Sequence, residues 1–233
     1  WTFNTENSAI NAITDYWYDC ASPTFSPDGK YLFFVSNRDF NPTYSATEWN
    51  HSYSDMSRIY FVTLKKSTKN PLKPEADEVN ITTTDNKESK SEKDKTKDKS
   101  TDVKSIAIAV DIDFDGIEQR VVDLPVEAAN YWNLTATKNA LYYTKYKQNK
   151  VCLNLYDFEE KKETNLGNYG SYLISFDRKK MAISNGSYYI IDLPKSKIDL
   201  KEELNLSGMK VMTDLTLEWN QIFTESWRQM RDF

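Results

Sequence analysis

Short apolar segments separated by polar turns recur along the chain. Residues 22–40 contain two such segments on either side of an Asp-Gly pair, and residues 134–147 and 174–186 repeat this arrangement. Two apolar residues stand seven positions apart across each turn: Phe25 and Leu32, Leu134 and Leu141, and Ile174 and Met181. Asp-Gly favours the left-handed backbone of a tight hairpin, and Asp177-Arg178 fills the same place less well. Each unit therefore predicts a β-hairpin.

A third apolar segment follows each hairpin, at residues 58–66, 151–162 and 187–197. Two of the units continue into a candidate fourth strand, at residues 117–125 and 162–167. Four strands in a period of about 40 residues are typical of a β-propeller blade and not of a sandwich. We therefore predict an all-β fold, a partial β-propeller of about three four-stranded blades.

The first and second units are separated by more sequence than one blade needs. The excess falls in residues 40–55 and 65–104. Thirteen of the twenty residues from 85 to 104 are charged, with nearly balanced signs, so we expect a disordered insertion over about 67–104 and not a docking segment. After it, every second residue from Ile106 to Phe114 is apolar, which predicts a strand buried on one face.

The end of the chain has a helical period. The apolar residues that share one face are Trp219, Ile222, Phe223, Met230 and Phe233. The helix should begin after Asp214 or Thr216, since either can cap it. Its polar side lacks the lysine excess of a membrane-binding helix, so we expect it to pack against protein. We expect propeller blades over residues 1–213 and this helix over residues 214–233.

Composition and charge narrow the classes of partner. The net charge of −5 and the pI near 5.1 disfavour nucleic acid, because the surface would repel phosphates. No apolar run approaches the roughly 18 residues that a membrane-spanning helix needs. The chain begins at Trp1 without a methionine and ends within a helical pattern, so we expect it to be a piece of a longer protein.

The candidate reactive side chains do not form a complete site. His51 is the only histidine, and its serine and aspartate neighbours are local in sequence, whereas a triad must converge in space. Cys20 and Cys152 do not form the Cys-x-x-Cys motif of zinc sites and redox pairs, and no histidine lies near them in sequence. We therefore expect two buried free thiols. We therefore predict no catalytic and no cofactor-binding residue.

One segment imitates part of a calcium loop. Residues 111–116 place carboxylates at alternate positions and a glycine at the sixth, but the twelfth position is Val122 and not a glutamate. We interpret the alternation as the solvent face of a strand and predict no metal site.

Three segments together resemble the tricorn proteases. These are residues 22–64, including SPDGKYLFFVSNRDF, residues 113–126, with DFDGIEQRVVDLPV, and residues 218–233, with EWNQIFTESWRQMRDF. SPDGKY alone occurs in many propellers, whereas the other two segments are specific. The resemblance implies the C-terminal part of the second propeller and the start of the following helical domain.

The resemblance also implies a function. Tricorn-like enzymes are large oligomeric serine proteases that cut short peptides and carry a PDZ domain and a catalytic domain after the helical domain. None of their catalytic residues falls on this sequence. The implied role is non-catalytic: substrate access, filtering and scaffold, with peptides and the downstream domains as partners and no cofactor. The resemblance suggests that the protein is cytoplasmic. Export stays an alternative, because an export signal would lie before Trp1.

Two alternatives remain open. The first is a stand-alone propeller that serves as a protein-interaction module. The second, a prolyl-oligopeptidase-like propeller, is disfavoured because a tryptophan-containing helix follows the blades here instead of an α/β-hydrolase domain. A ring cannot close with three blades, so we also expect the exposed sheet edges to pair with further chain or with a neighbouring molecule.

Overall fold

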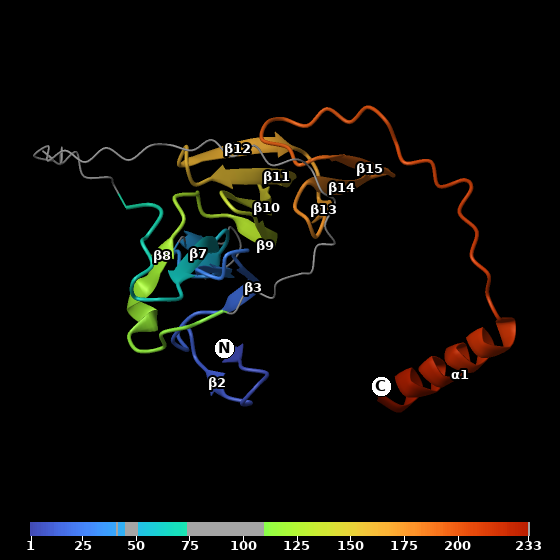
Figure 1. Ribbon diagram of the computed structural model, residues 1–233, viewed down its shortest axis with the longest axis horizontal. Coiled ribbons are helices and arrows are strands. Elements are labelled where there is room, and N and C mark those ends of the chain that lie inside the picture. The colour runs from blue at the N-terminus through green and yellow to red at the C-terminus, as the bar shows by residue number, and fades with distance from the viewer. Residues whose placement is uncertain (41, 45–50, 74–109, 233) are drawn as a thin grey trace, which may run out of the picture.

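The computed structural model describes residues 1–40, 42–44, 51–73 and 110–232, and of residues 43, 51 and 52 only the backbone. Three antiparallel sheets follow one another along the chain and form the body of the molecule (Figure 1). This arrangement confirms the predicted all-β partial propeller.

The first sheet has the strand order β3-β4-β7-β8. Its strands are β3 (Cys20–Phe25), β4 (Tyr31–Ser36), β7 (Arg58–Thr63) and β8 (Val121–Asp123). A short 3-10 helix, Ile117–Arg120, leads into β8. The predicted fourth strand therefore exists, but it begins later than the sequence pattern indicates.

The second sheet has the order β12-β11-β10-β9. Its strands are β9 (Asn130–Ala136), β10 (Ala140–Lys147), β11 (Lys150–Asp157) and β12 (Lys162–Gly167). The fourth strand coincides with the segment predicted for it, residues 162–167. Each strand pairs with its sequence neighbour, which is the meander expected of a blade.

The third sheet has three strands in the described part of the chain. They are β13 (Ser171–Ile174), β14 (Lys180–Asn185) and β15 (Ser187–Asp192). The amide of Leu204 donates a hydrogen bond to the carbonyl of Tyr188, so the chain after β15 returns to the outer edge of this sheet.

The hairpin turns of the first and third sheets are built alike. Phe25 opposes Leu32, and Ile174 opposes Met181, as their seven-residue spacing suggests. Gly29 and Arg178 both have positive φ, 66° and 58°, so an arginine adopts the left-handed conformation that glycine supplies in the first turn. The second hairpin is shorter, and there Leu141 opposes Ala136 instead of Leu134.

Three apolar clusters hold the sheets together. Phe33, Phe61, Leu141 and Tyr143 belong to the cluster between the first and second sheets. A second cluster, which includes Tyr142, joins the second sheet to the third. A third covers the far face of the first sheet. Burial on both faces follows from stacking blade on blade, and it explains the continuous apolar runs in β4 and β10.

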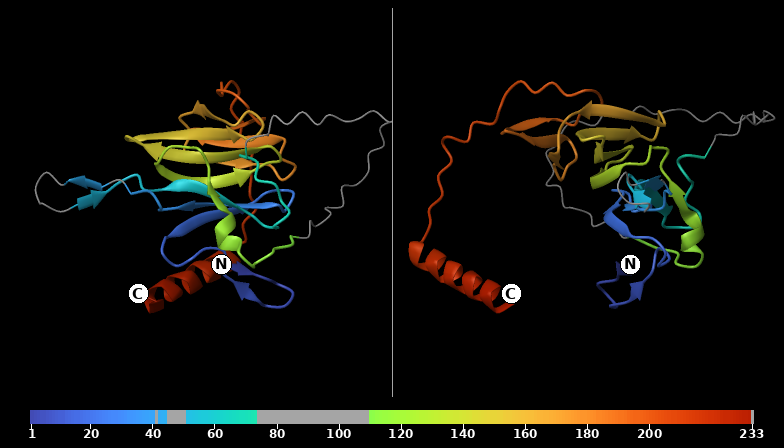
Figure 2. Two further views of the ribbon diagram at one scale, coloured as in Figure 1. Left: turned by 90° about the vertical axis from the view of Figure 1, so that its left-hand side faces the viewer. Right: turned by 180° about the vertical axis from the view of Figure 1, so that it is seen from behind.

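Two short hairpins extend from the body (Figure 2). One joins β1 (Thr2–Phe3) to β2 (Ile10–Asn11) and precedes the first sheet. The other joins β5 (Pro42–Tyr44) to β6 (His51–Tyr53) and occupies the connection between β4 and β7. The excess sequence predicted at residues 40–55 thus contains a hairpin of its own.

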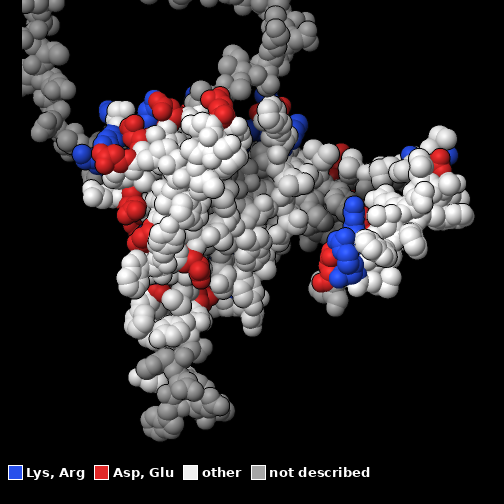
Figure 3. All heavy atoms as spheres, turned by 90° about the horizontal axis from the view of Figure 1, so that it is seen from below, with Lys and Arg blue, Asp and Glu red and all other residues white. Residues whose placement is uncertain are grey.

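The C-terminal helix α1 spans Leu215–Asp232. The carboxylate of Asp214 accepts hydrogen bonds from the amides of Thr216 and Leu217, which confirms one of the two predicted caps. None of its described residues is buried, and Figure 3 shows it standing apart from the body with a charged band between uncharged side chains. The packing expected of its apolar face is therefore not made within the described residues.

The segment after the charged insertion departs from the predicted strand. Residues 74–109 lie outside the described residues, and residues 110–114 form no strand. Asp111 and Asp115 instead form ion pairs of 2.5 Å with Lys65 and Lys66. The alternating carboxylates thus clamp the segment to the end of β7, and the interpretation as the solvent face of a strand is wrong.

Candidate functional site: a polar pocket between two blades

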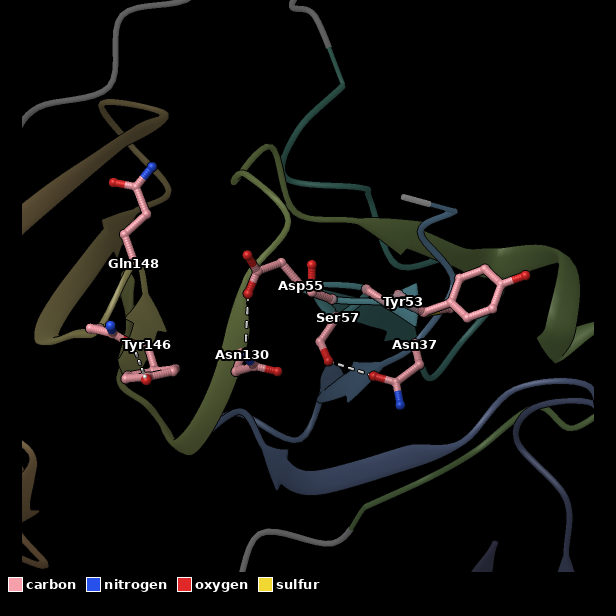
Figure 4. Close-up of a pocket in the computed structure, with 10 residues that line it drawn as sticks. Asn37, Tyr53, Asp55, Ser57, Asn130, Tyr146 and Gln148 are labelled. Atoms are coloured by element: carbon pink, nitrogen blue, oxygen red, sulfur yellow. Dashed lines mark hydrogen bonds between the residues drawn. The ribbon is translucent and has the colours of Figure 1, made fainter. Parts of the chain in front are cut away.

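The pocket lies at the end of the sheets where connections from two blades meet. The first blade contributes the connection between β4 and β7, and the second contributes the start of β9 and the β10–β11 turn. In an up-and-down sheet every second connection emerges at the same end, so these segments meet although 90 residues or more separate parts of them. Figure 4 shows the two walls facing each other.

The wall from the first blade presents polar side chains on a short, bent segment. Ser57, almost fully buried, donates a hydrogen bond from its hydroxyl to the side-chain oxygen of Asn37. Asp55 has a φ of 53°, a left-handed conformation that aspartate tolerates. Its carboxylate accepts a hydrogen bond of 3.2 Å from the amide nitrogen of Asn130, at the start of β9. The contact joins the two blades within the pocket lining.

The opposite wall is a two-residue hairpin turn. Lys147 and Lys150 are the last paired residues of β10 and β11, so Gln148 and Asn149 alone form the turn. Both have positive φ, 50° and 59°, as a type I′ turn requires. The hydroxyl of Tyr146 donates a hydrogen bond of 2.8 Å to the side-chain oxygen of Asn149 and holds that amide at the rim.

The pocket is open and lined mainly by uncharged polar groups. Its volume is roughly 520 Å³, which lies in the range usual for ligand-binding pockets. Side-chain amides offer both donors and acceptors, which match the alternating N–H and C=O groups of an extended backbone. Among the ten lining residues, Asp55 is the single charged side chain.

Lys147, next to the turn that lines the pocket, belongs to a group of paired charges on the second blade. The carboxylate of Glu127 forms ion pairs with the ammonium groups of Lys145, at 2.7 Å, and Lys147, at 2.5 Å. Hydrogen bonds from these two ammonium groups lower the pKa of Glu127 to about 2, so it is ionised at neutral pH. Lys145 also lies 3.4 Å from Glu163, which accepts a hydrogen bond from the buried hydroxyl of Tyr143. Burial and the Glu163 charge raise the pKa of Tyr143, so it stays neutral.

Two of the candidate reactive residues, the His51 neighbours Ser54 and Asp55, line this pocket, whereas neither cysteine does. The backbone of His51 lies in β6, and its side chain lies outside the described part of the structure. Within the residues that the structure describes, no group of three His, Cys, Asp or Glu side chains could hold a metal ion. The described helices include none that is long and apolar enough to cross a membrane.

The prediction that both thiols are buried is wrong. Both cysteines are free, but Cys20 is exposed and Cys152 is only partly buried. Cys20 begins β3, which is an edge strand among the described residues, and its thiol lies 3.4 Å from the hydroxyl of Ser36. Cys152 contacts the side-chain oxygen of Asn168 at 3.4 Å.

Sequence reasoning did not predict the pocket, although it weighed Asp55 as a neighbour of His51. Asn37, Asn130 and Gln148 belong to no motif, and they meet Asp55 only because two blades stack. The recurrence of hairpins was a usable signal, since it implies that equivalent connections of successive blades lie at one end of the sheets. It would have placed the β4–β7 connection beside the β10–β11 turn, without giving the contacts between them.

Comparisons with known proteins agree with the fold. Residues 2–193 match the family described as the second β-propeller domain of tricorn protease. A tricorn protease homolog 1 from Streptomyces coelicolor is 26% identical over 251 residues, covering 98% of this chain and 22% of that protein. A tricorn protease homolog from Saccharolobus solfataricus is 27% identical, covering 97% of this chain and 20% of that protein.

A solved structure gives the same result for the fold. The crystal structure of the tricorn protease matches 99% of this chain and 21% of its own chain, with a TM-score of 0.68 and 19% identity. This chain thus spans about a fifth of the length of the relatives it matches. The match over residues 2–193 covers most of the sequence. The chain therefore belongs to the tricorn protease family, as a segment of its second β-propeller domain.

Proposed function

We propose that this propeller segment is a non-catalytic part of a serine protease that degrades short peptides, and that it admits and guides extended peptides while excluding folded proteins. The cutting groups lie in other domains of the same protein. The amide-lined pocket at the meeting of two blades is the observation that carries this proposal. Its lining suits a peptide backbone of any sequence, because amide donors and acceptors do not select side chains.

The edge strands support a passage role. The strands β3, β9 and β13 each lie at one edge of their sheet, and β13 is tied to β9 by reciprocal hydrogen bonds between Asn133 and Tyr172. These edges face the same side of the stack, where a peptide can contact strand backbone as well as loop tips. Such contacts require an extended chain, which a folded protein does not offer.

The wider assignment rests on the family. Relatives of this chain are named tricorn protease homologs. By resemblance, the propeller cooperates with a helical domain begun by α1, with a PDZ domain and with a catalytic domain in a cytoplasmic homo-oligomer.

Peptidase activity tests the division of labour. The full-length protein and the 233-residue chain are each incubated with short fluorogenic peptides, with and without a serine-directed covalent inhibitor. We expect hydrolysis by the full-length protein alone, abolished by the inhibitor. A folded protein substrate and its permanently unfolded form provide the test of filtering, and only the unfolded form should be cut. Inhibitor-sensitive hydrolysis by the short chain would contradict the proposal.

A further inference from the structure

Within the described residues, Asp55 is a carboxylate without a cationic partner. It is partly buried in the pocket wall, and the one hydrogen bond that it accepts from these residues comes from the neutral side-chain amide of Asn130. No Lys or Arg of the described residues pairs with it. A partly buried carboxylate is stabilised by an opposite charge, so this pocket favours a positively charged group.

Two basic residues close to the pocket in sequence, Arg58 and Lys147, are already engaged. Arg58 donates to the carboxylate of Asp39 and to the carbonyl of Val126. Lys147, next to the turn that forms the opposite wall, pairs with Glu127. Neither of these two residues can neutralise Asp55 without breaking an existing contact.

Arg38 is held in another way. Its guanidinium lies 5.0 Å from the ring centre of Tyr60 and 5.3 Å from that of Tyr18. These cation–π contacts hold the arginine on the aromatic surface of the first blade.

The pocket lining also contains neutral groups that can accept hydrogen bonds. An ammonium group has three donors, and it is best satisfied by several oxygen atoms around it. Figure 4 shows the carboxylate of Asp55 between the two walls, beside Asn130, with Gln148 and Tyr146 across the pocket. Gln148 and Asn130 line the same pocket, and each adds a neutral side-chain amide that contains one acceptor oxygen.

From this geometry we infer that Asp55 forms a subsite for a positively charged group of a bound peptide. The group is either the α-ammonium of the peptide or the end of a Lys or Arg side chain. This inference rests on the proposed peptide-guiding function and adds a preference to it. The neutral amides hold any backbone, and Asp55 favours peptides that place a cation in the pocket.

Binding of four pentapeptides to the inhibited full-length protein separates the possibilities. Each peptide carries a fluorophore at its C-terminus for anisotropy measurements and contains no other charged residue. One has a free N-terminus, one is acetylated, one is acetylated with a single lysine, and one has norleucine in place of that lysine. The difference between the free and the acetylated peptide measures the contribution of the α-ammonium. The difference between the lysine and the norleucine peptide measures the contribution of the charged side chain.

Two variants with the same change in net charge provide the control. Asp55→Asn keeps the size of the side chain and an oxygen for Asn130, and asparagine tolerates the left-handed backbone there. Asp199→Asn removes an exposed carboxylate whose side chain is 81% accessible, far from the pocket in sequence. We expect wild type and Asp199→Asn to prefer at least one cationic peptide over its neutral counterpart by about three- to tenfold. Asp55→Asn should lose that preference, so that each cationic peptide binds no more tightly than its neutral counterpart.

The outcomes distinguish this inference from the proposed function. Equal binding of cationic and neutral peptides by wild type overturns the cation subsite and leaves the peptide-guiding function intact. A preference that Asp55→Asn and Asp199→Asn weaken equally also overturns it, since the effect then comes from net charge. Failure of all four peptides to bind contradicts the guiding function itself.

Discussion

At the scale of single residues, the second blade is distinguished by charges that neutralise one another. Glu127 binds two lysines, and Lys145 also approaches Glu163. These contacts could not be predicted from the sequence, because Glu127 lies 18 and 20 residues from its partners and no local pattern links them. The positive φ of Gly29, in contrast, was predictable from the Asp-Gly pair alone.

The pKa of Glu127 gives a prediction for acid stability. Its value in the folded protein is about 2 instead of 4.5, so its contribution is present above pH 4.5 and is lost as the pH falls towards about 2. Glu127→Gln should therefore show a smaller loss of unfolding free energy over this range than wild type, measured by urea unfolding at several pH values. Glu160→Gln, at an exposed turn and without an ion pair in the described residues, is the control for the removal of one carboxylate. Identical slopes for wild type and Glu127→Gln would contradict the ion-pair assignment.

At the scale of elements, the sequence predicted the strands well and the irregular segments poorly. Alternating and continuous apolar runs predicted β4, β7 and β10 correctly, because stacked sheets bury both faces of such strands. The same pattern misled at residues 110–114, where lysine–carboxylate pairs hold the chain without strand pairing. The β5–β6 hairpin was not expected either, since its strands are only three residues long.

The contact between the second and third sheets depends on a tyrosine hydroxyl. Tyr172 of β13 is 2% accessible, and its hydroxyl donates to the carbonyl of Asn133 in β9. Tyr172→Phe leaves that carbonyl without its partner, so the free energy of unfolding should fall by about 1–2 kcal/mol. Tyr188→Phe removes an exposed hydroxyl and should have little effect. Chemical denaturation of both variants measures the difference, and equal stability would show that the hydroxyl does not lock the blades.

At the scale of the whole molecule, the stack of sheets has an uncovered apolar face. Phe33 of the first sheet and Tyr142 of the second pack against the next sheet along the chain. The same face of the third sheet carries Leu173, Tyr188 and Ile190, which are 72%, 54% and 56% accessible. The repeat in the sequence predicted this succession of blades, but the pocket between them depends on how two blades stack.

The uncovered face predicts self-association of the separate chain. At micromolar concentration it should form dimers or larger species by sedimentation velocity, because burying exposed apolar side chains is favourable. The double variant Leu173→Thr with Ile190→Thr should shift the population towards monomer, since threonine retains strand propensity and lowers apolar area. Exposed replacements in α1, such as Thr224→Ser, serve as the control. A strictly monomeric wild-type chain would contradict this expectation.

Hydrogen exchange of the full-length protein is the measurement that tests the central claim most directly. The protein is first inhibited covalently at its serine, and exchange is then followed by mass spectrometry with and without saturating short peptide. If the blades guide peptides, exchange should slow at residues 53–57 and 146–149, the two walls of the pocket. Slower exchange confined to segments outside this propeller, with both walls unchanged, would contradict the account.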